Sequence, residues 1–235
     1  MKAKFVYEAM GDVLKPKSRE EILASMMNLD PNELMRQSSK FGFLTGVEKA
    51  IENGADVYNS ALLYASENGH YDIIKFLIEN GADIHASNDG ALQWASYQGH
   101  YEVVKLLLDN GADIHVSNDY ALRTASKYGY DEVVKLLLNR GADVHVVDDY
   151  ALRFASERGQ YDVVALLLDN GANIHADNDY ALRWASLNGY YDVVALLLEN
   201  GANVHAENDD ALRYASENGH YDVVELLKKY MENEE

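Results

Sequence analysis

Apolar and polar positions follow a helical rhythm along most of this chain, and the rhythm is clearest between residues 118 and 147. Residues 121–125 place Ala, Leu and Ala at helical spacing, and residues 133–138 carry a wider stripe of Val and Leu after Gly129. The pattern therefore predicts two amphipathic helices that are separated by a glycine turn.

The residues beside these stripes indicate where each helix begins and ends. Asn118 or Asp119 is the expected N-cap of the first helix, because its side-chain oxygen can accept from the free amides of the first turn. Gly129 and Gly141 allow the left-handed conformation that commonly ends a helix. We expect the segment 142–147, ADVHVV, to be an extended connector.

The same sequence pattern recurs every 30 residues, and its glycines form two regularly spaced series, which we call ladders. The first ladder comprises Gly99, Gly129, Gly159, Gly189 and Gly219, and the second comprises Gly81, Gly111, Gly141, Gly171 and Gly201. One helix pair cannot bury its apolar stripes alone, so successive pairs must stack into an array with a continuous core. Such an array offers a surface for binding rather than a pocket for chemistry.

The repeat resembles the ankyrin repeat family, most closely in the segment 99–115, GHYEVVKLLLDNGADIH. The resemblance covers residues 32–230 and implies an all-α ankyrin repeat solenoid of stacked helix-turn-helix units with short connecting loops. Two departures stand out: the usual repeat has about 33 residues, and its Thr-Pro-Leu-His start is replaced here by Tyr120-Ala121-Leu122-Arg123. The variant is similar to ankyrin proteins of giant viruses that infect amoebae.

We expect an N-terminal helical cap at residues 1–31 and a repeat domain at residues 32–235. The seven predicted repeats are 32–58, 59–88, 89–118, 119–148, 149–178, 179–208 and 209–235, of which the last ends in a C-terminal cap. Within the N-terminal cap, Ser18 to Glu21 forms a capping box, and Asp30 precedes a proline at the first helical position. Alternatively, the N-terminal region is a docking segment built on Phe5–Ala9.

The Thr and His that tie neighbouring repeats in the family are absent from this variant. We predict that a ladder of Asp–Arg pairs replaces them. Each aspartate lies just before a first helix, its arginine follows four residues on, and stacking could extend the pairing between repeats. The carboxylates would be Asp119, Asp149, Asp179 and Asp209, and the cations Arg123, Arg153, Arg183 and Arg213.

The formal net charge of −19 lies entirely on the repeats, because residues 1–31 carry equal numbers of cations and carboxylates. An acidic surface repels phosphate backbones, so we expect no binding to nucleic acid. The same charge would speed the encounter with a basic partner, or it serves solubility alone.

The chain has no cysteine, which excludes disulfides and thiolate metal sites and fits a reducing compartment. No apolar run reaches 18 residues, and the first 17 residues lack the apolar stretch of a secretion signal. We therefore expect no membrane segment and a cytoplasmic protein, in the host cytoplasm if the viral resemblance holds.

The histidines recur at two repeat positions, which are His85, His115, His145, His175 and His205, and His70, His100 and His220. Helices in adjacent repeats pack about 8–10 Å apart, whereas ligands lie about 2.0–2.1 Å from a zinc ion. Equivalent histidines therefore cannot share a metal, and we expect them to bond locally to the backbone. The sequence predicts no metal and no cofactor.

No residue pattern indicates an enzyme. The recurring serines read as small helix-packing residues and lack the strand-turn-helix setting of a nucleophile: Ser66, Ser96, Ser126, Ser156, Ser186 and Ser216. The carboxylates are periodic, so no pair is singled out for acid–base catalysis.

The positions that vary between repeats are the best candidates for contact with a partner. They are the two residues before the mid-repeat glycine and a bulky position after the arginine, and they are rich in the aromatics that interfaces use. The candidate residues are Trp94, Tyr97, Gln98, Lys127, Tyr128, Phe154, Glu157, Arg158, Trp184, Leu187, Asn188 and Tyr214. The alternative is that the bulky rings mainly pack against the next repeat.

We predict a non-catalytic, monomeric module that binds a protein partner, ideally through a basic segment, on an acidic and Tyr-rich concave face. Two alternatives stay open. One is a structural or engineered scaffold without a dedicated partner, and the other is an assembly component that self-associates through its ends.

Overall fold

The computed structural model describes residues 18–232, and every regular element within this range is a helix. The chain divides into two compact units, with the boundary between Ala82 and Asp83. None of the described helices combines the length and the apolar composition that a bilayer crossing requires. The boundary predicted from the sequence, between an N-terminal cap that ends at residue 31 and the repeat domain, does not coincide with this division, and it stays a prediction.

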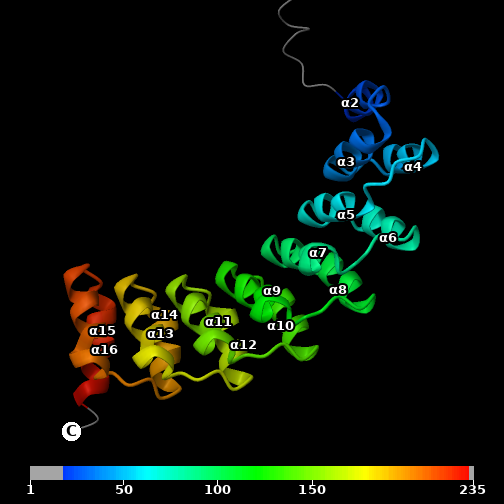
Figure 1. Ribbon diagram of the computed structural model, residues 1–235. Helices are drawn as coiled ribbons and strands as arrows, with labels where there is room; N and C mark the ends of the chain where they lie inside the picture. Colours follow the sequence, from blue (N-terminus) through cyan, green and yellow to red (C-terminus); the bar gives the residue numbers. More distant parts are fainter. Residues whose placement is uncertain (1–17, 233–235) are drawn as a thin grey trace, which may run out of the picture. The chain divides into compact units, whose positions relative to one another are not determined.

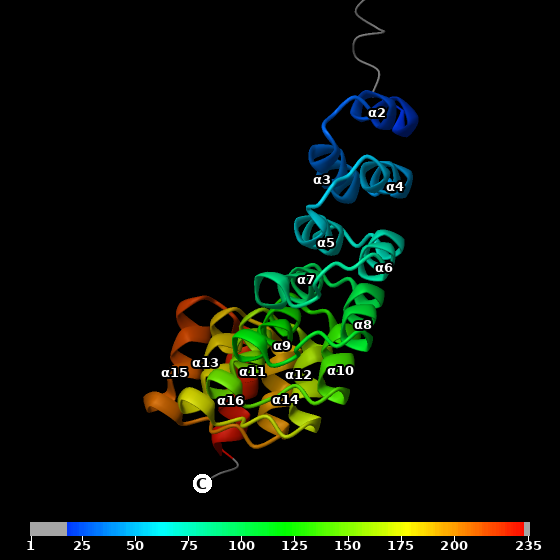
Figure 2. The same cartoon turned by 45° about the vertical axis from the view of Figure 1, so that its right-hand side comes forward.

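Unit 1 contains a single helix followed by two helix pairs. The elements are α2 (Arg19–Met26), α3 (Pro31–Phe41) with α4 (Leu44–Glu52), and α5 (Tyr58–Glu67) with α6 (Tyr71–Glu79). Helix α2 lies beside α3 at one end of the unit (Figure 2).

The caps predicted for the N-terminal part of unit 1 are confirmed. The Ser18 hydroxyl accepts from the Glu21 amide at 3.1 Å, and the Glu21 carboxylate accepts from the Ser18 amide at 2.7 Å. The Asp30 carboxylate accepts from the amides at the start of α3, directly before Pro31. The alternative docking segment, Phe5–Ala9, lies outside the described residues.

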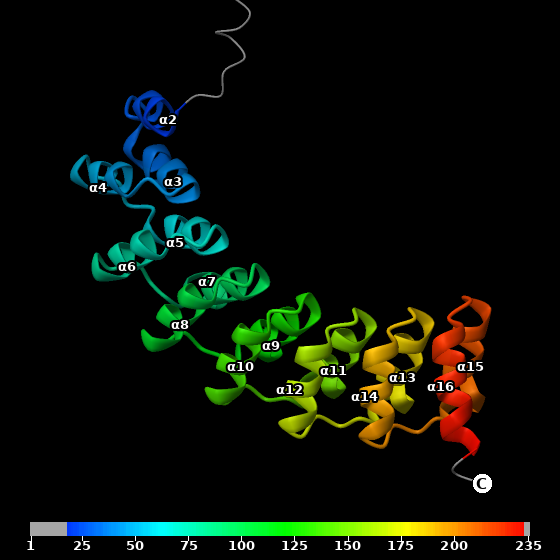
Figure 3. The ribbon, with the colours of Figure 1, turned by 180° about the vertical axis from the view of Figure 1, so that it is seen from behind.

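Unit 2 contains five helix pairs of the same design. They are α7 (Ala86–Tyr97) with α8 (Tyr101–Asp109), α9 (Val116–Tyr128) with α10 (Asp131–Asn139), α11 (Val146–Glu157) with α12 (Tyr161–Asp169), α13 (Ala176–Leu187) with α14 (Tyr191–Glu199), and α15 (Ala206–Glu217) with α16 (Tyr221–Glu232). Within this unit the first helices of the pairs contact one another in sequence, and so do the second helices (Figures 1 and 3).

The predicted apolar stripes form the core of unit 2. In one repeat, Ala121 and Leu122 of α9 and Val134 and Leu137 of α10 are all fully buried, and the equivalent positions of the internal repeats are buried too. Burying one such leucine or valine contributes about 1.5–3 kcal/mol, so the stacked stripes are the main source of stability. The glycine ends are confirmed as well, because Gly129 and Gly141 take the left-handed conformation, with φ of 79° and 94°.

The connectors of unit 2 are compact turns, which contradicts the extended connector expected for residues 142–147. Each connector enters the next first helix through three consecutive residues of left-handed backbone; in one repeat these are Ser117, Asn118 and Asp119, with φ of 53°, 56° and 48°. Left-handed conformation costs an ordinary residue roughly 1–2 kcal/mol, so the turn must be held by other interactions. Neither Asn118 nor Asp119 acts as the predicted N-cap.

The arginine of each central repeat holds this left-handed turn. Arg123 donates to the carbonyl oxygens of Asn118 and Ser117 at 2.9 and 2.8 Å, and Arg153 and Arg183 make the equivalent pairs of bonds. The predicted Asp–Arg pairs four residues apart are therefore wrong. Because the aspartate precedes the regular helix, its side chain does not share a helical face with the arginine. Arg153 and Arg183 pair instead with Asp177 and Asp210, which lie at the start of the next first helix, at 2.9 and 3.7 Å.

The aspartate that ends the turn connects one repeat to the next. The Asp149 carboxylate accepts from His145 Nδ1 at 3.1 Å and from the main-chain amide of Asn173, in the following repeat, at 2.7 Å. Asp89 and Asp179 accept in the same way from an amide 24 residues on, and all three side chains are at most 7% exposed. We call this arrangement the aspartate clasp. At Asp119, burial raises the pKa of the carboxyl, and the bond to His115 opposes that shift.

We expect Val147→Asn to raise the free energy of unfolding by about 1 kcal/mol. Val147 begins a left-handed turn with φ 53° and ψ 47°, a conformation that suits a β-branched residue least and asparagine well. Its side chain is 45% exposed, so little packing would be lost. Denaturant unfolding at an unchanged m-value measures the gain. Ser117→Asn, at the same position of another turn, should gain less, and a loss of stability in Val147→Asn would contradict the prediction.

Candidate functional site

The twelve predicted site residues all lie on the first helices of unit 2 or on the residues that cap them, and none of them is buried. We name the exposed and half-buried side chains of α7, α9, α11, α13 and α15, with their C-caps, the first-helix face. The repeat therefore brings the candidates onto one continuous surface.

The aromatic side chains of this face form two groups. In the first group the edge of one ring meets the face of the next, with Trp94 and Tyr97 5.8 Å apart and Tyr97 and Tyr128 5.0 Å apart. Tyr130, the N-cap of α10, adds a ring at the border of the face, tilted by 32° and 6.4 Å from Tyr128. In the second group the rings form a row with centroid separations of 3.9 to 6.4 Å, in the order Tyr150, Phe154, Tyr180, Trp184 and Tyr214.

The two tryptophans differ in exposure because of the residue four positions before each. Tyr180 stacks on Trp184, with centroids 5.2 Å apart, so that Trp184 is half-buried. Gly90 stands at the position equivalent to Tyr180, offers no ring, and leaves Trp94 43% exposed. The first group, which also exposes 41% of Tyr128, is therefore the more accessible one.

Cations lie over several of these rings. The Arg123 guanidinium is 5.1 Å from the Tyr150 centroid, Arg153 is 5.3 Å from Tyr180, and the Lys127 ammonium is 5.3 Å from Phe154. Such contacts stabilise by about 0.5–1 kcal/mol where water reaches them. For the second group, the predicted alternative of packing between repeats thus has direct contacts in its favour.

Glu157 has two partners from the next repeat. The Tyr180 hydroxyl donates to the Glu157 carboxylate at 2.6 Å, and the side-chain amide of Asn188 donates to the main-chain carbonyl of Glu157 at 3.3 Å. Burial, and then this bond to Glu157, raise the pKa of the Tyr180 hydroxyl well above its ordinary value. At Tyr97, the hydrogen bond with Tyr128 is the main cause of a raised pKa. Both hydroxyls therefore stay protonated near neutral pH.

Charge changes across the first-helix face. The turn edge, where the first helices begin, exposes the carboxylates of Asp148, Asp177 and Glu207. The regular parts of the first helices carry five cations (Arg123, Lys127, Arg153, Arg183, Arg213) and three carboxylates (Glu157, Asp210, Glu217). The carboxylate excess of unit 2 thus lies on its turns and second helices.

The histidines serve the contacts between repeats. Five of them bond a carboxylate at the turns rather than the backbone, which corrects the expectation of a backbone bond: His85, His115, His145, His175 and His205. His70 and His220 bond a main-chain oxygen of the preceding repeat, each at 3.0 Å. Between residues 18 and 232, no three histidines and carboxylates converge to hold a metal ion.

Five of the six recurring serines are packed as predicted: Ser66, Ser96, Ser126, Ser156 and Ser186 are fully buried, and their hydroxyls have no hydrogen-bond partner among the described residues. Ser216 of the last repeat is exposed, contrary to the prediction, and donates to the Leu212 carbonyl at 2.7 Å. A buried hydroxyl without a base beside it is not an activated nucleophile.

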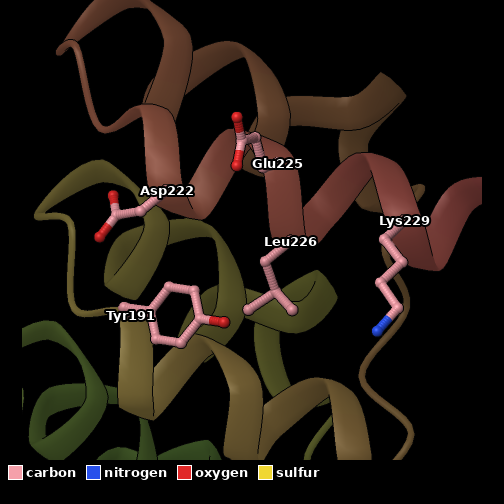
Figure 4. Close-up of a pocket in the computed structure, with 5 residues that line it drawn as sticks. All are labelled: Tyr191, Asp222, Glu225, Leu226 and Lys229. Carbon is pink, nitrogen blue, oxygen red and sulfur yellow. The ribbon is translucent and has the colours of Figure 1, made fainter.

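Shallow grooves lie between neighbouring second helices. One of about 450 Å³ is lined by Tyr191, Asp222, Glu225, Leu226 and Lys229, and Leu226 points toward the ring of Tyr191 (Figure 4). An equivalent groove of about 310 Å³, with Tyr161 and Leu196, lies one repeat earlier. Their recurrence indicates that stacking creates these grooves, and neither gathers a nucleophile with a base.

The structural role of the clasp aspartates and the place of Tyr130 in the first aromatic group did not follow from the sequence. A signal for the clasp was present, because a histidine precedes each of these aspartates by four residues at a fixed period. For Tyr130, the signal was a large aromatic side chain directly after Gly129, at a position that carries Tyr again at residue 190 and Phe, His or Gln in the other repeats.

Comparison with known proteins agrees with this architecture. A family model of ankyrin repeats (three copies) matches residues 34–118, 122–208 and 152–234. The crystal structure of the ankyrin repeat domain of human ASB11 superposes with a TM-score of 0.72 at 26% identity, over 82% of this chain and 96% of that domain.

A viral relative matches over a shorter segment. An ankyrin repeat protein of Acanthamoeba polyphaga mimivirus is 45% identical over 42 residues, which are 17% of this chain and 32% of the viral protein. The likeness thus spans about a third of the viral protein's length.

Proposed function

Because the chain belongs to the ankyrin repeat family, we propose that it is a non-catalytic module that binds a protein partner on the first-helix face of unit 2. Ankyrin repeats are generally protein–protein interaction modules. The observation that carries the proposal is the accessible aromatic group of Trp94, Tyr97 and Tyr128, in which two rings expose more than two fifths of their surface. Large exposed rings on one surface are typical of interface hot spots.

The charges suggest how the partner lies on this face. Apolar or aromatic side chains of the partner would cover the rings, and a basic segment would lie along the turn edge beside Asp148, Asp177 and Glu207. The net charge of −19 would speed the encounter with such a segment, particularly at low ionic strength. The partner we propose is therefore a protein segment with an apolar stretch and flanking Lys or Arg.

A peptide library displayed on phage tests the proposal. Peptides selected on the wild-type protein should be enriched in aromatic or aliphatic residues flanked by Lys or Arg. Their affinity should fall at least tenfold in a Trp94→Ser, Tyr128→Ser variant, because hot-spot side chains contribute about 2 kcal/mol or more.

The matched control is Tyr161→Ser with Tyr191→Ser, since these two tyrosines are 46% and 42% exposed but lie on second helices. Both variants are compared at equal thermal stability. Peptides that bind the first variant as tightly as the wild type, or that lose affinity only for the control variant, would move the site away from the first-helix face.

A further inference from the structure

Eight Asn-Gly pairs occur in the chain, and in each the asparagine closes a helix while the glycine takes the left-handed conformation. The asparagines are Asn53, Asn68, Asn80, Asn110, Asn170, Asn188, Asn200 and Asn218, and all of them are exposed. Asn-Gly is chemically the most labile asparagine sequence, because glycine has no side chain to shield its amide nitrogen.

Seven of the eight asparagine side chains are held in place. Their Nδ2 groups donate to the main-chain carbonyl four residues earlier at 2.8 to 2.9 Å, as in the bond from Asn80 to Phe76. Asn53 is the exception: its main-chain amide donates to the Lys49 carbonyl at 3.1 Å, but its side chain makes no hydrogen bond to any residue between 18 and 232.

We propose that Asn53 is a site of spontaneous deamidation. After hydroxide removes the Gly54 amide proton, that nitrogen attacks Asn53 Cγ; the new C–N bond closes a five-membered imide, the Cγ–Nδ2 bond breaks, and ammonia leaves. Water then opens the imide at either carbonyl and gives aspartate or isoaspartate, with no change in oxidation state. Gly54 is exposed, and a Cβ placed on it would meet no atom within 4 Å, so no side chain covers this turn.

The side-chain bond is what separates Asn53 from the other seven asparagines. The backbone is nearly the same, with φ −89° and ψ 6° at Asn53 and φ −99° and ψ 14° at Asn80. The following glycine amide is engaged in both cases, at 2.9 Å for Gly54 and 3.1 Å for Gly81. A held side chain must first break its bond before Cγ can turn toward that amide, which slows the reaction about 2- to 12-fold per hydrogen bond.

Deamidation at this position would act on the connector of unit 1. The Ala55 amide donates to the Ala50 carbonyl at 3.0 Å, and the Asp56 amide donates to the Asn32 side chain at 2.8 Å, a contact that resembles the aspartate clasp. Isoaspartate lengthens the main chain by one carbon directly before both bonds. The new carboxylate also lies between Glu52 and Asp56 in the sequence, so it adds like-charge repulsion.

Peptide mass spectrometry of the intact chain tests the proposal, after incubation in mildly alkaline buffer at physiological temperature. The same incubation in denaturant measures the intrinsic rate of each site, and the ratio of denatured to native rate gives its protection. Asn53 should show several-fold less protection than each of the other seven asparagines. Equal protection at all eight sites, or greater protection at Asn53 than elsewhere, would overturn the proposal.

A second measurement follows the structural consequence. Aged wild-type protein should be cleaved faster by protease in the connector 53–57 than fresh protein, whereas aged Asn53→Ser protein should not. If aged Asn53→Ser protein is cleaved as fast as aged wild type, deamidation at Asn53 is not what loosens the connector.

Discussion

Replacing Asp149 by alanine is expected to lower the free energy of unfolding by about 3 kcal/mol. The Asp149 side chain is only 5% exposed, and its carboxylate accepts from His145 and from the Asn173 amide of the next repeat. The alanine variant leaves that partly buried main-chain amide without its acceptor, and it also removes an interaction that helps to hold a costly left-handed turn. Chemical denaturation monitored by circular dichroism measures the loss.

Asp209→Ala is the matched control. Asp209 has the same left-handed backbone, with φ 64°, and the same bond to its histidine, but its side chain is 45% exposed and no described repeat follows it. Both variants replace an aspartate in a left-handed turn, so their difference isolates the contact between repeats. Equal losses in the two variants would show that the clasp contributes nothing beyond the turn itself.

The position of Asp149 also predicts how the array unfolds. In a stacked array, stability is the sum of the stability of each repeat and of each interface between neighbours. A weakened interface in the middle of unit 2 should therefore split one cooperative transition into two, with a lower m-value for each step. Asp209→Ala, at the last repeat, should leave a single transition.

The local structure of the helices could be predicted from the sequence, because the signals for it are local. The apolar spacing around Leu122 and Leu137 and the left-handed glycines Gly129 and Gly141 each depend on a few neighbouring residues, and the structure agrees with them. The same holds for the capping box at Ser18.

The left-handed turns could not be predicted in this way. Asn118 and Asp119 suit an N-cap and a left-handed turn equally well, so local preference does not decide between the two. The left-handed turn forms even at residues 207–209, which no described repeat follows. The Asp–Arg ladder failed for the same reason, since the rule for residues four apart holds only if both lie in a right-handed helix.

The aromatic residues of the candidate site were partly predictable. Periodicity placed Trp94 and Trp184 at equivalent positions, but their exposure depends on whether residue 90 or 180 supplies a ring. The sequence does contain this difference, because residue 90 is glycine and residue 180 is tyrosine. Its effect on the exposure of the tryptophans can be predicted only once it is known that rings four residues apart stack on each other.

The second large effect is expected at Gly159, where alanine should cost about 3 kcal/mol. Gly159 has φ 71°, and a Cβ built there would lie 2.8 Å from the Tyr190 ring of the next repeat. The variant therefore combines backbone strain with a clash against the Tyr190 ring, three atoms of which would lie within 2.9 Å of the new Cβ. Gly219→Ala has the same strain, with φ 76°, and no atom within 4 Å, so it should cost about 1–2 kcal/mol.

A double-mutant cycle separates the two contributions at Gly159. In a Tyr190→Ala background the clash is absent, so Gly159→Ala should cost no more than Gly219→Ala does in the wild type. If the cost at Gly159 is the same with and without the Tyr190 ring, the close approach is irrelevant and the glycine is needed only for its backbone conformation. If the cost falls as expected, Gly159 has two functions: it ends its own helix, and it makes room for the residue that follows the mid-repeat glycine of the next repeat. The second function sets how closely neighbouring repeats approach, and it explains why side chains as different as Tyr130, Gln160 and His220 share one position.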